Sequence, residues 1–167
     1  LGALLTALEA YPHREPVVDG CRYREALQAV HVEGGVAGNV VPDSAMVRIN
    51  HRYAPDRTGA EAEAHVRDFL APFLDGDSDV VELVDHSPAA PPGLSHPLLR
   101  AITDRHRLEV RAKLGWTDVA FFAEHGVPAV NLGPGEPTLA HTADERVERS
   151  AVESCYQVLR DLLLNGV

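Results

Sequence analysis

A proline-rich segment divides this chain into two parts of different character. The segment SPAAPPGLSHP, residues 87–97, carries prolines at positions 88, 91, 92 and 97. Because proline has no backbone N–H and a fixed φ, such a segment interrupts helices and central strands. It predicts a linker or domain crossing. We therefore expect a first domain over residues 1–90 and a second over residues 91–167.

The first part has the pattern of a helix, two strands, a helix and a strand. Leu1, Leu4, Leu5 and Leu8 follow helical spacing, and no capping residue stands before them, so we expect the C-terminal piece of a longer protein. Strands are predicted over 27–35, 45–53 and 79–87, and a helix capped by Thr58 over 58–74. With one strand added in front, this order is βαββαβ, the ferredoxin-like sandwich.

The second part has α/β character. Helices are predicted over 96–106, over 117–126 with Thr117 as the cap, and from about Glu145 to Leu163. Short strands are predicted over 108–115 and over VPAVNLG, residues 127–133. The apolar run in the second of these is typical of a strand buried between helices.

Composition and charge exclude several classes of function. The chain is 45% hydrophobic and carries a formal net charge of −10, whereas a nucleic-acid-binding surface needs clustered Lys and Arg. Cys21 and Cys155 form no CxxC pair, which argues against a disulfide framework or a thiolate zinc site. The sequence has no apolar run of membrane-spanning length. We expect a cytoplasmic protein with neither nucleic-acid nor membrane partners.

His141 lies between a Gly/Pro-rich loop and a predicted helix. Thr142 and Glu145 have the spacing of a capping box, which accounts for both of them but not for His141. Isolated histidines are more often structural or exposed than functional. In α/β folds, however, ligands collect at the carboxyl ends of strands, and imidazole is a common zinc ligand. One histidine alone is not a metal site.

Two segments carry a resemblance to a known family. GWTDVAFFAEHGVPAVNLGPGEPTLAHTADERV, residues 115–147, resembles the C-terminal catalytic segment of the zinc-dependent aminoacylase and carboxypeptidase-like peptidases. It is most similar to the succinyl-diaminopimelate desuccinylases of actinobacterial type. GNVVPDSAMVRINHRY, residues 38–53, resembles a segment of the same family's inserted lid domain. The two segments stand in the family's order and together extend the resemblance over nearly the whole chain.

The resemblance implies both a fold and an activity. The fold would be a ferredoxin-like dimerisation lid, lacking its first strand, joined to the C-terminal part of an α/β zinc-hydrolase catalytic domain. The full-length parent would use two zinc ions, or cobalt, to hydrolyse a small-molecule N-acyl amino acid. The substrate would be N-succinyl-LL-2,6-diaminopimelate, giving succinate and LL-2,6-diaminopimelate for lysine biosynthesis. The protein would form a homodimer through the lid.

The resemblance also implies roles for individual residues. His141 matches a zinc ligand, and Asn39 matches a lid asparagine that reaches the partner subunit's site. The expected substrate-binding residues are Asn39, Arg52, Thr117, Asp118, Gly133 and Gly135. Without the resemblance, Arg52 is equally a solvated arginine on a polar strand face. Thr117 and Asp118 are then a helix cap and its acidic first turn.

The chain also lacks residues that the family's chemistry needs. It contains no H-x-D sequence and no Glu-Glu pair, which in the family supply further metal ligands and the general base. We therefore expect no catalytic residue in this chain, one metal ligand, and no activity from the chain alone. Two alternatives remain open. One is the same machinery acting on another N-acyl amino acid or peptide, as in acetylornithine deacetylase or a dipeptidase. The other is a non-catalytic dimerisation module in which His141 is inert.

Overall fold

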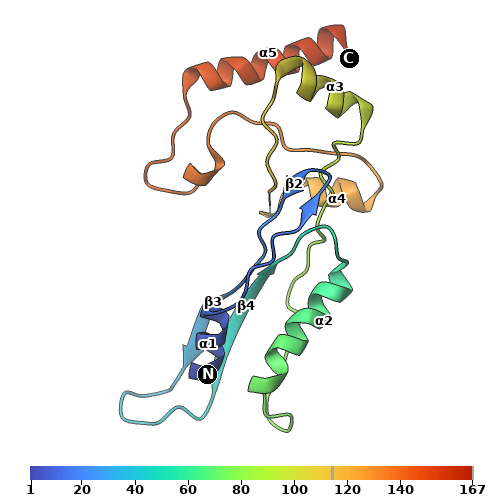
Figure 1. Ribbon diagram of the computed structural model, residues 1–167. Helices are drawn as coiled ribbons and strands as arrows, with labels where there is room; N and C mark the ends of the chain where they lie inside the picture. Colours follow the sequence, from blue (N-terminus) through green and yellow to red (C-terminus); the bar gives the residue numbers. More distant parts are fainter. Residues whose placement is uncertain (114, 167) are drawn as a thin grey trace.

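A long antiparallel hairpin forms the spine of the N-terminal part (Figure 1). The computed structural model describes residues 1–113 and 115–166. Strands β3 (Ala26–Gly34) and β4 (Ala45–Arg52) pair from Ala26 opposite Arg52 to Gly34 opposite Ala45, with a register shift between Ala29 and His31. The predictions of strands at 27–35 and 45–53 are confirmed within a residue or two.

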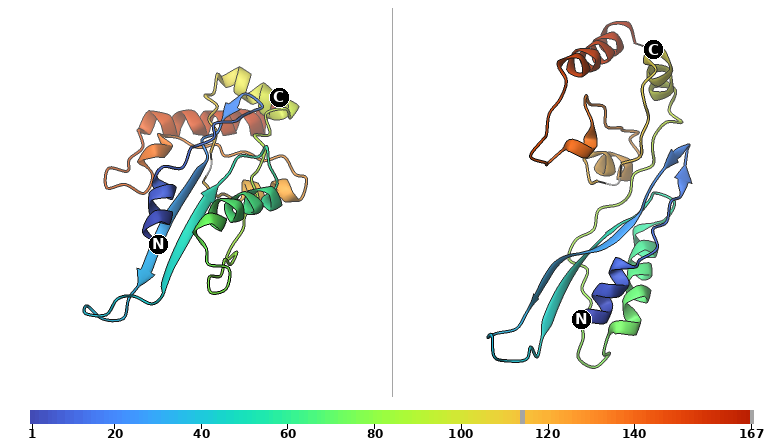
Figure 2. Two further views of the ribbon diagram at one scale, coloured as in Figure 1. Left: turned by 60° about the horizontal axis from the view of Figure 1, so that its bottom comes forward. Right: turned by 60° about the vertical axis from the view of Figure 1, so that its left-hand side comes forward.

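Helices α1 (Gly2–Glu9) and α2 (Gly59–Leu70) lie on the same face of this hairpin (Figure 2). Leu8, Tyr11 and Leu27 form a buried core between the helices and the sheet. Further side chains pack against it from all four elements: Leu4, Leu5, Ala29, Ile49, Val66 and Phe69. Side chains alternate between the two faces of a strand, so β4 directs only one face toward this core.

The start of α2 is fixed by reciprocal hydrogen bonds. The Glu61 backbone N–H donates to Thr58 Oγ1 at 3.3 Å, and the Thr58 backbone N–H donates to Glu61 Oε2 at 2.7 Å. This capping box satisfies two N–H groups that the first turn leaves without helical partners. The sequence-based prediction of Thr58 as the cap is confirmed. A 3₁₀ turn, η1 (Ala71–Phe73), follows α2.

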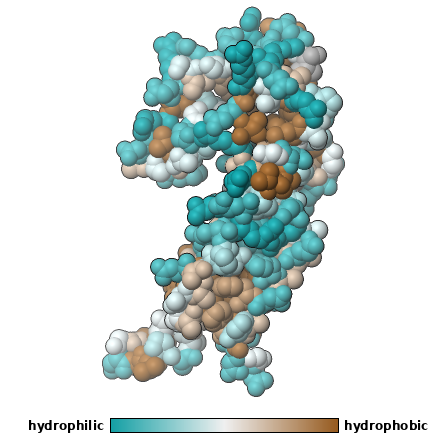
Figure 3. Space-filling view, in the orientation of Figure 1, coloured by the Kyte–Doolittle hydropathy of each residue, from teal (hydrophilic) through white to brown (hydrophobic). Residues whose placement is uncertain are grey.

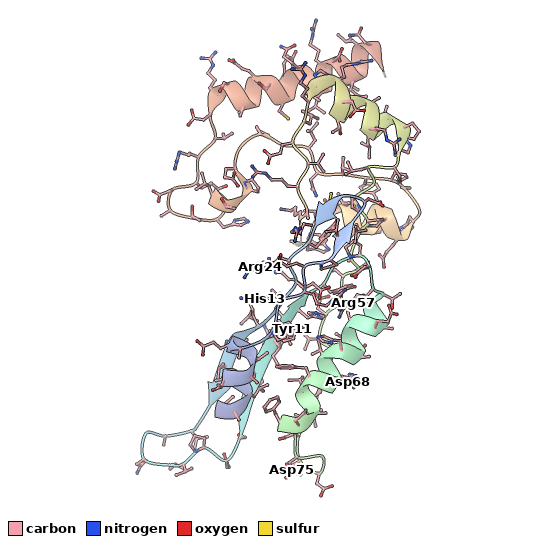
Figure 4. The ribbon with its side chains drawn as sticks, viewed as in Figure 1. Tyr11, His13, Arg24, Arg57, Asp68 and Asp75 are labelled. Atoms are coloured by element: carbon pink, nitrogen blue, oxygen red, sulfur yellow. The ribbon has the colours of Figure 1, made fainter. Side chains whose placement is uncertain are left out.

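The buried carboxylate of Glu25 stabilises the end of the hairpin where β3 begins and β4 ends. Glu25 is fully buried and accepts hydrogen bonds from Arg14 Nη1 at 2.9 Å and from the Ala54 backbone N–H at 3.0 Å. Arg57 Nη2 lies 3.5 Å from its second oxygen. Arg57 and Tyr11, labelled in Figure 4, lie where this end of the hairpin meets α2. The small hairpin β1 (Val17–Val18) and β2 (Cys21–Arg22) precedes Glu25 in the chain.

The C-terminal part is built from helices joined by long irregular segments. It contains α3 (Pro97–His106), α4 (Val119–Glu124), the 3₁₀ turn η2 (Pro137–Leu139) and α5 (Arg149–Asn165). Helices α3 and α5 contact each other, and His106 Nε2 lies 2.9 Å from Asp161 Oδ2. In the part of the chain that the structure describes, no helix combines the length and the apolar character needed to cross a membrane.

Three predicted strands are wrong. Segments 79–87 and 127–133 form no strand, nor do the described residues of 108–115, of which residue 114 lies outside the description. Among the described residues, strands occur only in the two hairpins. A strand requires a neighbour to receive its backbone hydrogen bonds, and these segments have none within the described chain. Val80 and Val84 are accordingly 88% and 73% exposed despite their apolar side chains.

The predicted capping box at the final helix is also wrong. Helix α5 begins at Arg149 with Glu148 at its N-cap, four residues later than expected from Glu145. The Thr142 hydroxyl instead donates to the Leu139 carbonyl at 2.7 Å. The α/β composition is confirmed in its coarse form, as a mixture of helices and strands.

We predict that Glu25→Gln destabilises the chain by about 3 kcal/mol, because removing one partner leaves buried polar groups without compensation. Arg14 and Arg57 would lose their shared carboxylate. Urea denaturation followed by circular dichroism measures this loss. Glu33→Gln is the matched control, since Glu33 lies on β3, the strand that follows Glu25 directly, but is 73% exposed in its side chain. Equal stabilities for the two variants would contradict the prediction.

Candidate functional site

A large open cavity lies where the N- and C-terminal parts meet. Its volume is about 1040 Å³. The walls come from the end of β4, from the proline-rich segment, and from the irregular segments that flank α4, with contributions from α3 and α5. The lining residues of these segments are 50–53, 55, 85–92, 94, 108–111, 113, 115–117, 119 and 129–132. Strongly apolar surface is exposed near β2 and α4 (Figure 3). Concave sites with mixed apolar and polar walls are the usual ligand-binding places.

The structure brings two of the predicted site residues to this cavity. Arg52, the last residue of β4, lines it, and its Nε donates to Asn50 Oδ1 at 3.3 Å. Thr117 lines it from the other part of the chain, and Asn131 Nδ2 donates to Thr117 Oγ1 at 3.1 Å. The cavity wall therefore contains the guanidinium of Arg52, from the hairpin, and the hydroxyl of Thr117, from the C-terminal part.

Asp118 borders a smaller neighbouring pocket of about 470 Å³, which it shares with Trp116 and Thr117. Asp118 is the N-cap residue of α4 but makes no side-chain capping bond. The prediction that Thr117 itself caps this helix is wrong. Its hydroxyl is engaged by Asn131, and the helix starts one residue later than expected.

Four predicted site residues lie away from the cavity. Asn39 is exposed in the β3–β4 loop, at the end of the hairpin opposite Arg52. Gly133, Gly135 and His141 belong to the exposed segment between α4 and α5. None of the four lines the cavity. The described chain thus does not assemble the seven predicted residues into one site.

His141 has an unusual backbone conformation. Its φ is +63°, in the left-handed region that non-glycine residues seldom adopt. The His141 backbone N–H donates to Glu145 Oε2 at 2.9 Å, which stabilises this turn. The Glu145 side chain therefore stabilises the loop at His141 and does not cap a helix. Gly135 is also left-handed, with φ +91°, and a Cβ there would lie 3.2 Å from the Val147 side chain.

The residues of this chain do not fit a zinc site by themselves. A structural or catalytic zinc ion takes at least three protein donors. Among the described residues, no group of three or more His, Cys, Asp or Glu side chains is placed to hold a metal ion. His141 is exposed and stands as one donor. Any metal bound through His141 would need its other ligands from outside this chain.

A row of histidine and tyrosine rings extends from the space between β4 and α2 to the cavity, whose wall includes His51, Tyr53 and His86. Tyr11 Oη and His65 Nε2 are 2.6 Å apart, and Tyr53 Oη and His86 Nε2 are 2.9 Å apart. His51 stands between these pairs, with ring centroids 5.7 Å from both His65 and Tyr53. His51 is not among the site residues expected from the sequence. His51 follows Val47 and Ile49 at every second position of β4, and this alternation predicts that its side chain faces the helices.

His51 is kept neutral by its surroundings. Burial lowers the pKa of the His51 imidazole below its ordinary value of 6.5. Glu25 acts in the opposite direction, while His65 and Arg57 reinforce the lowering. His51 Nε2 is buried and has no hydrogen-bond partner within the described chain. A proton added there would be poorly solvated and would face neighbouring positive charge.

We predict that acid weakens the fold through His51. Because its folded-state pKa is depressed, the unfolded state binds the proton more readily, so its stabilising contribution is complete above pH 6.5 and is lost as pH falls through the folded-state value. Unfolding free energies from urea titrations between pH 5 and 8 measure this loss. His51→Leu should flatten the dependence, whereas His31→Leu, at an exposed site on β3, should leave it unchanged. An identical pH profile in His51→Leu would refute the assignment.

Comparison with known proteins gives a consistent result. A family model described as Peptidase family M20/M25/M40 matches residues 10–165. A Mycobacterium tuberculosis (H37Rv) protein, provisionally named as the succinyl-diaminopimelate desuccinylase DapE, is 50% identical over 163 residues, covering 98% of this chain and 45% of its own length. The succinyl-diaminopimelate desuccinylase of Corynebacterium glutamicum is 38% identical over 165 residues, covering 98% and 44%. That of Rhodospirillum rubrum is 31% identical over 148 residues, covering 83% and 37%. The chain spans less than half the length of these relatives.

Proposed function

The chain belongs to the peptidase family M20/M25/M40, and we propose that it is the C-terminal portion of a metal-dependent amidohydrolase of that family. The proposed reaction is hydrolysis of N-succinyl-LL-2,6-diaminopimelate to succinate and LL-2,6-diaminopimelate, a step in lysine and diaminopimelate biosynthesis. The observation that carries this proposal is 50% identity over 98% of the chain to a relative named for that activity. Two further relatives carry the same activity in their names.

Residues 1–90 would form the ferredoxin-like lid and dimerisation domain, and residues 91–167 the end of the catalytic domain. Two features support this division. Helices α1 and α2 cover one face of the β3–β4 hairpin, and a ferredoxin-like sandwich likewise has one layer of helices packed on one sheet. Each of these strands pairs only with the other in the described residues, so each has an outer edge free to pair with a further strand. A homodimer formed through the lid would use such an edge.

The proposed metal is zinc, two ions per full-length subunit, with cobalt as an alternative. His141 would supply one ligand, and the others would come from the part of the protein that this sequence does not contain. The left-handed turn held by Glu145 supports a specialised role for this loop, since non-glycine residues in strained conformations cluster at functional sites. The general base would also lie outside this chain, so residues 1–167 alone would be inactive.

Substrate contacts are proposed for Asn39, Arg52, Thr117, Asp118, Gly133 and Gly135. Arg52 has the clearest support, because it lines the cavity, is exposed, and has no carboxylate partner among the described residues. A guanidinium pairs with a carboxylate through two parallel hydrogen bonds. Asn39 lies at the end of the hairpin far from this cavity, so its proposed substrate contact would be in a partner subunit's site.

A cytoplasmic location is part of the proposal. Cys21 and Cys155 are both free thiols, as expected in a reducing compartment. The alternatives within the family are deacetylation of acetylornithine or cleavage of a dipeptide. The alternative from another functional class is a dimerisation module without activity, in which His141 is inert.

A chimera tests the proposal directly. This chain would replace the matching segment of the Corynebacterium glutamicum desuccinylase, to which it is 38% identical over 98% of its length. We expect the chimera to hydrolyse N-succinyl-LL-2,6-diaminopimelate and to do so faster than it hydrolyses N-acetylornithine. His141→Ala in the chimera should lower kcat/KM by at least about 100-fold and reduce bound metal, since loss even of a ligand's supporting partner costs 10–100-fold.

The control variant is His125→Ala, at an exposed histidine outside the proposed site, which should leave activity and metal content unchanged. Succinate release is followed with a coupled assay, and bound metal by mass spectrometry of the purified protein. A folded chimera that prefers N-acetylornithine would reassign the substrate. A folded chimera with no hydrolytic activity toward either substrate would favour the non-catalytic module.

A further inference from the structure

The chain's only lysine lies in the wall of the large cavity. Lys113 is exposed and lines the cavity together with Arg52. The two residues come from different parts of the chain, β4 and the irregular segment before α4. No role is predicted for Lys113 from the sequence, where it falls in the predicted strand 108–115.

A small apolar cluster brings the backbones beside these two cations together. Cys21, Tyr23 and the fully buried Ala54 form this cluster, and Ala112 packs against it. Arg52 lies two residues before Ala54, and Lys113 follows Ala112 directly. The contact therefore brings the backbones next to both cations to one junction, where the end of the hairpin meets the C-terminal part.

Neither cation is neutralised by the protein. Among the described residues, Arg52 and Lys113 have no carboxylate within 4.0 Å, whereas Arg111, in the same wall, is paired with Glu109 at 2.7 Å and with Glu136 at 2.8 Å. The other charged residue of the lining is Asp85. With the Glu109–Arg111 pair cancelled, the unpaired lining charges are two cations and one anion. Among the described residues, the lining side chains that have no ion-pair partner thus carry one net positive charge, although the chain as a whole carries −10.

The surroundings of Lys113 are those of a binding residue. A Cβ placed on Gly115 would lie 3.7 Å from Lys113 Nζ, so the ammonium group lies close over the Gly115 backbone. Trp116 borders the same cavity and is 67% exposed. A large exposed aromatic beside unpaired cations offers apolar contact to a ligand whose charged ends reach the cations.

We propose that Lys113 and Arg52 bind the two carboxylates of one acyclic dicarboxylate ligand, and that Lys113 determines the preference for a second negative charge. The inference deepens the proposed function by naming a specificity-determining residue. It rests on that function only for the identity of the natural substrate. A monocarboxylate would satisfy one cation and leave the other facing the ligand's neutral end.

Fluorescence of Trp116, the only tryptophan, measures binding to the 167-residue chain without any need for catalysis. The probes are pimelate and its monoamide, which have the same length and differ by one charge, titrated at constant ionic strength. Pimelate should bind about tenfold more tightly than the monoamide, as expected for one charge-assisted hydrogen bond. Lys113→Met should weaken pimelate binding to the level of the monoamide and leave the monoamide little affected.

Arg100→Met is the matched control for Lys113→Met, because Arg100 is an exposed cation on α3 that does not line the cavity and has no ion pair among the described residues. It should bind both probes as the unmodified chain does. Arg52→Met should also weaken pimelate binding, and Arg48→Met is its matched control, since both residues lie on the same exposed face of β4. Circular dichroism checks that each variant is folded. Equal affinities for the two probes, unchanged binding in Lys113→Met, or no saturable response to pimelate would each overturn the proposal.

The chimera separates this inference from the proposed function. There, Lys113→Met should raise KM for N-succinyl-LL-2,6-diaminopimelate about tenfold with kcat nearly unchanged, the signature of lost ground-state and transition-state binding alike. An inactive chimera together with charge-selective pimelate binding by the chain would refute the proposed reaction and leave the dicarboxylate site standing. An active chimera whose KM is unchanged by Lys113→Met would support the proposed reaction and refute the dicarboxylate site.

Discussion

The buried carboxylate of Glu25 is the interaction on which the N-terminal part depends. It ties together two segments that are distant in the sequence: Arg14, before the first small hairpin, and the turn between β4 and α2 that carries Ala54 and Arg57. A fully buried charge is tolerable only where several donors compensate for lost hydration. This requirement fixes the direction in which the chain leaves β4. Arg52 lies two residues before Ala54, so its position in the cavity wall depends on the same contact.

The two faces of β4 have different roles, one in the core beneath the helices and one in the cavity wall. Val47, Ile49 and His51 point toward the helices, while Arg48, Asn50 and Arg52 point away from them. His51 ends the apolar row where α2 begins, and its neutral imidazole occupies a place that an aliphatic side chain could fill. His51 lies near His65 of α2 and also lines the cavity, so this strand borders both the helix-covered core and the cavity.

Local patterns in the sequence correctly predicted those elements whose hydrogen-bond partners lie within the described chain. The β3–β4 hairpin, the Thr58 cap of α2 and the helix at 97–106 each find their hydrogen-bond partners nearby in the chain, so alternation and capping rules sufficed. The strands predicted at 79–87 and 127–133 failed for the complementary reason. Their apolar sequences suit a buried sheet, but the described residues provide no neighbouring strand. Likewise, motif resemblance singled out His141, while its remaining ligands cannot come from the described residues.

The charge of the cavity illustrates why composition alone is a poor guide to binding. A net charge of −10 opposes the approach of an anion at long range, and at physiological salt that repulsion is screened beyond about 8 Å. Within that distance, the sign of the nearest unpaired groups decides, and at this junction they are Arg52 and Lys113 with Asp85 as the one opposing charge. Ligand binding that depends on such short-range contacts gains little from electrostatic steering, so selectivity between one and two carboxylates must arise in the dissociation rate.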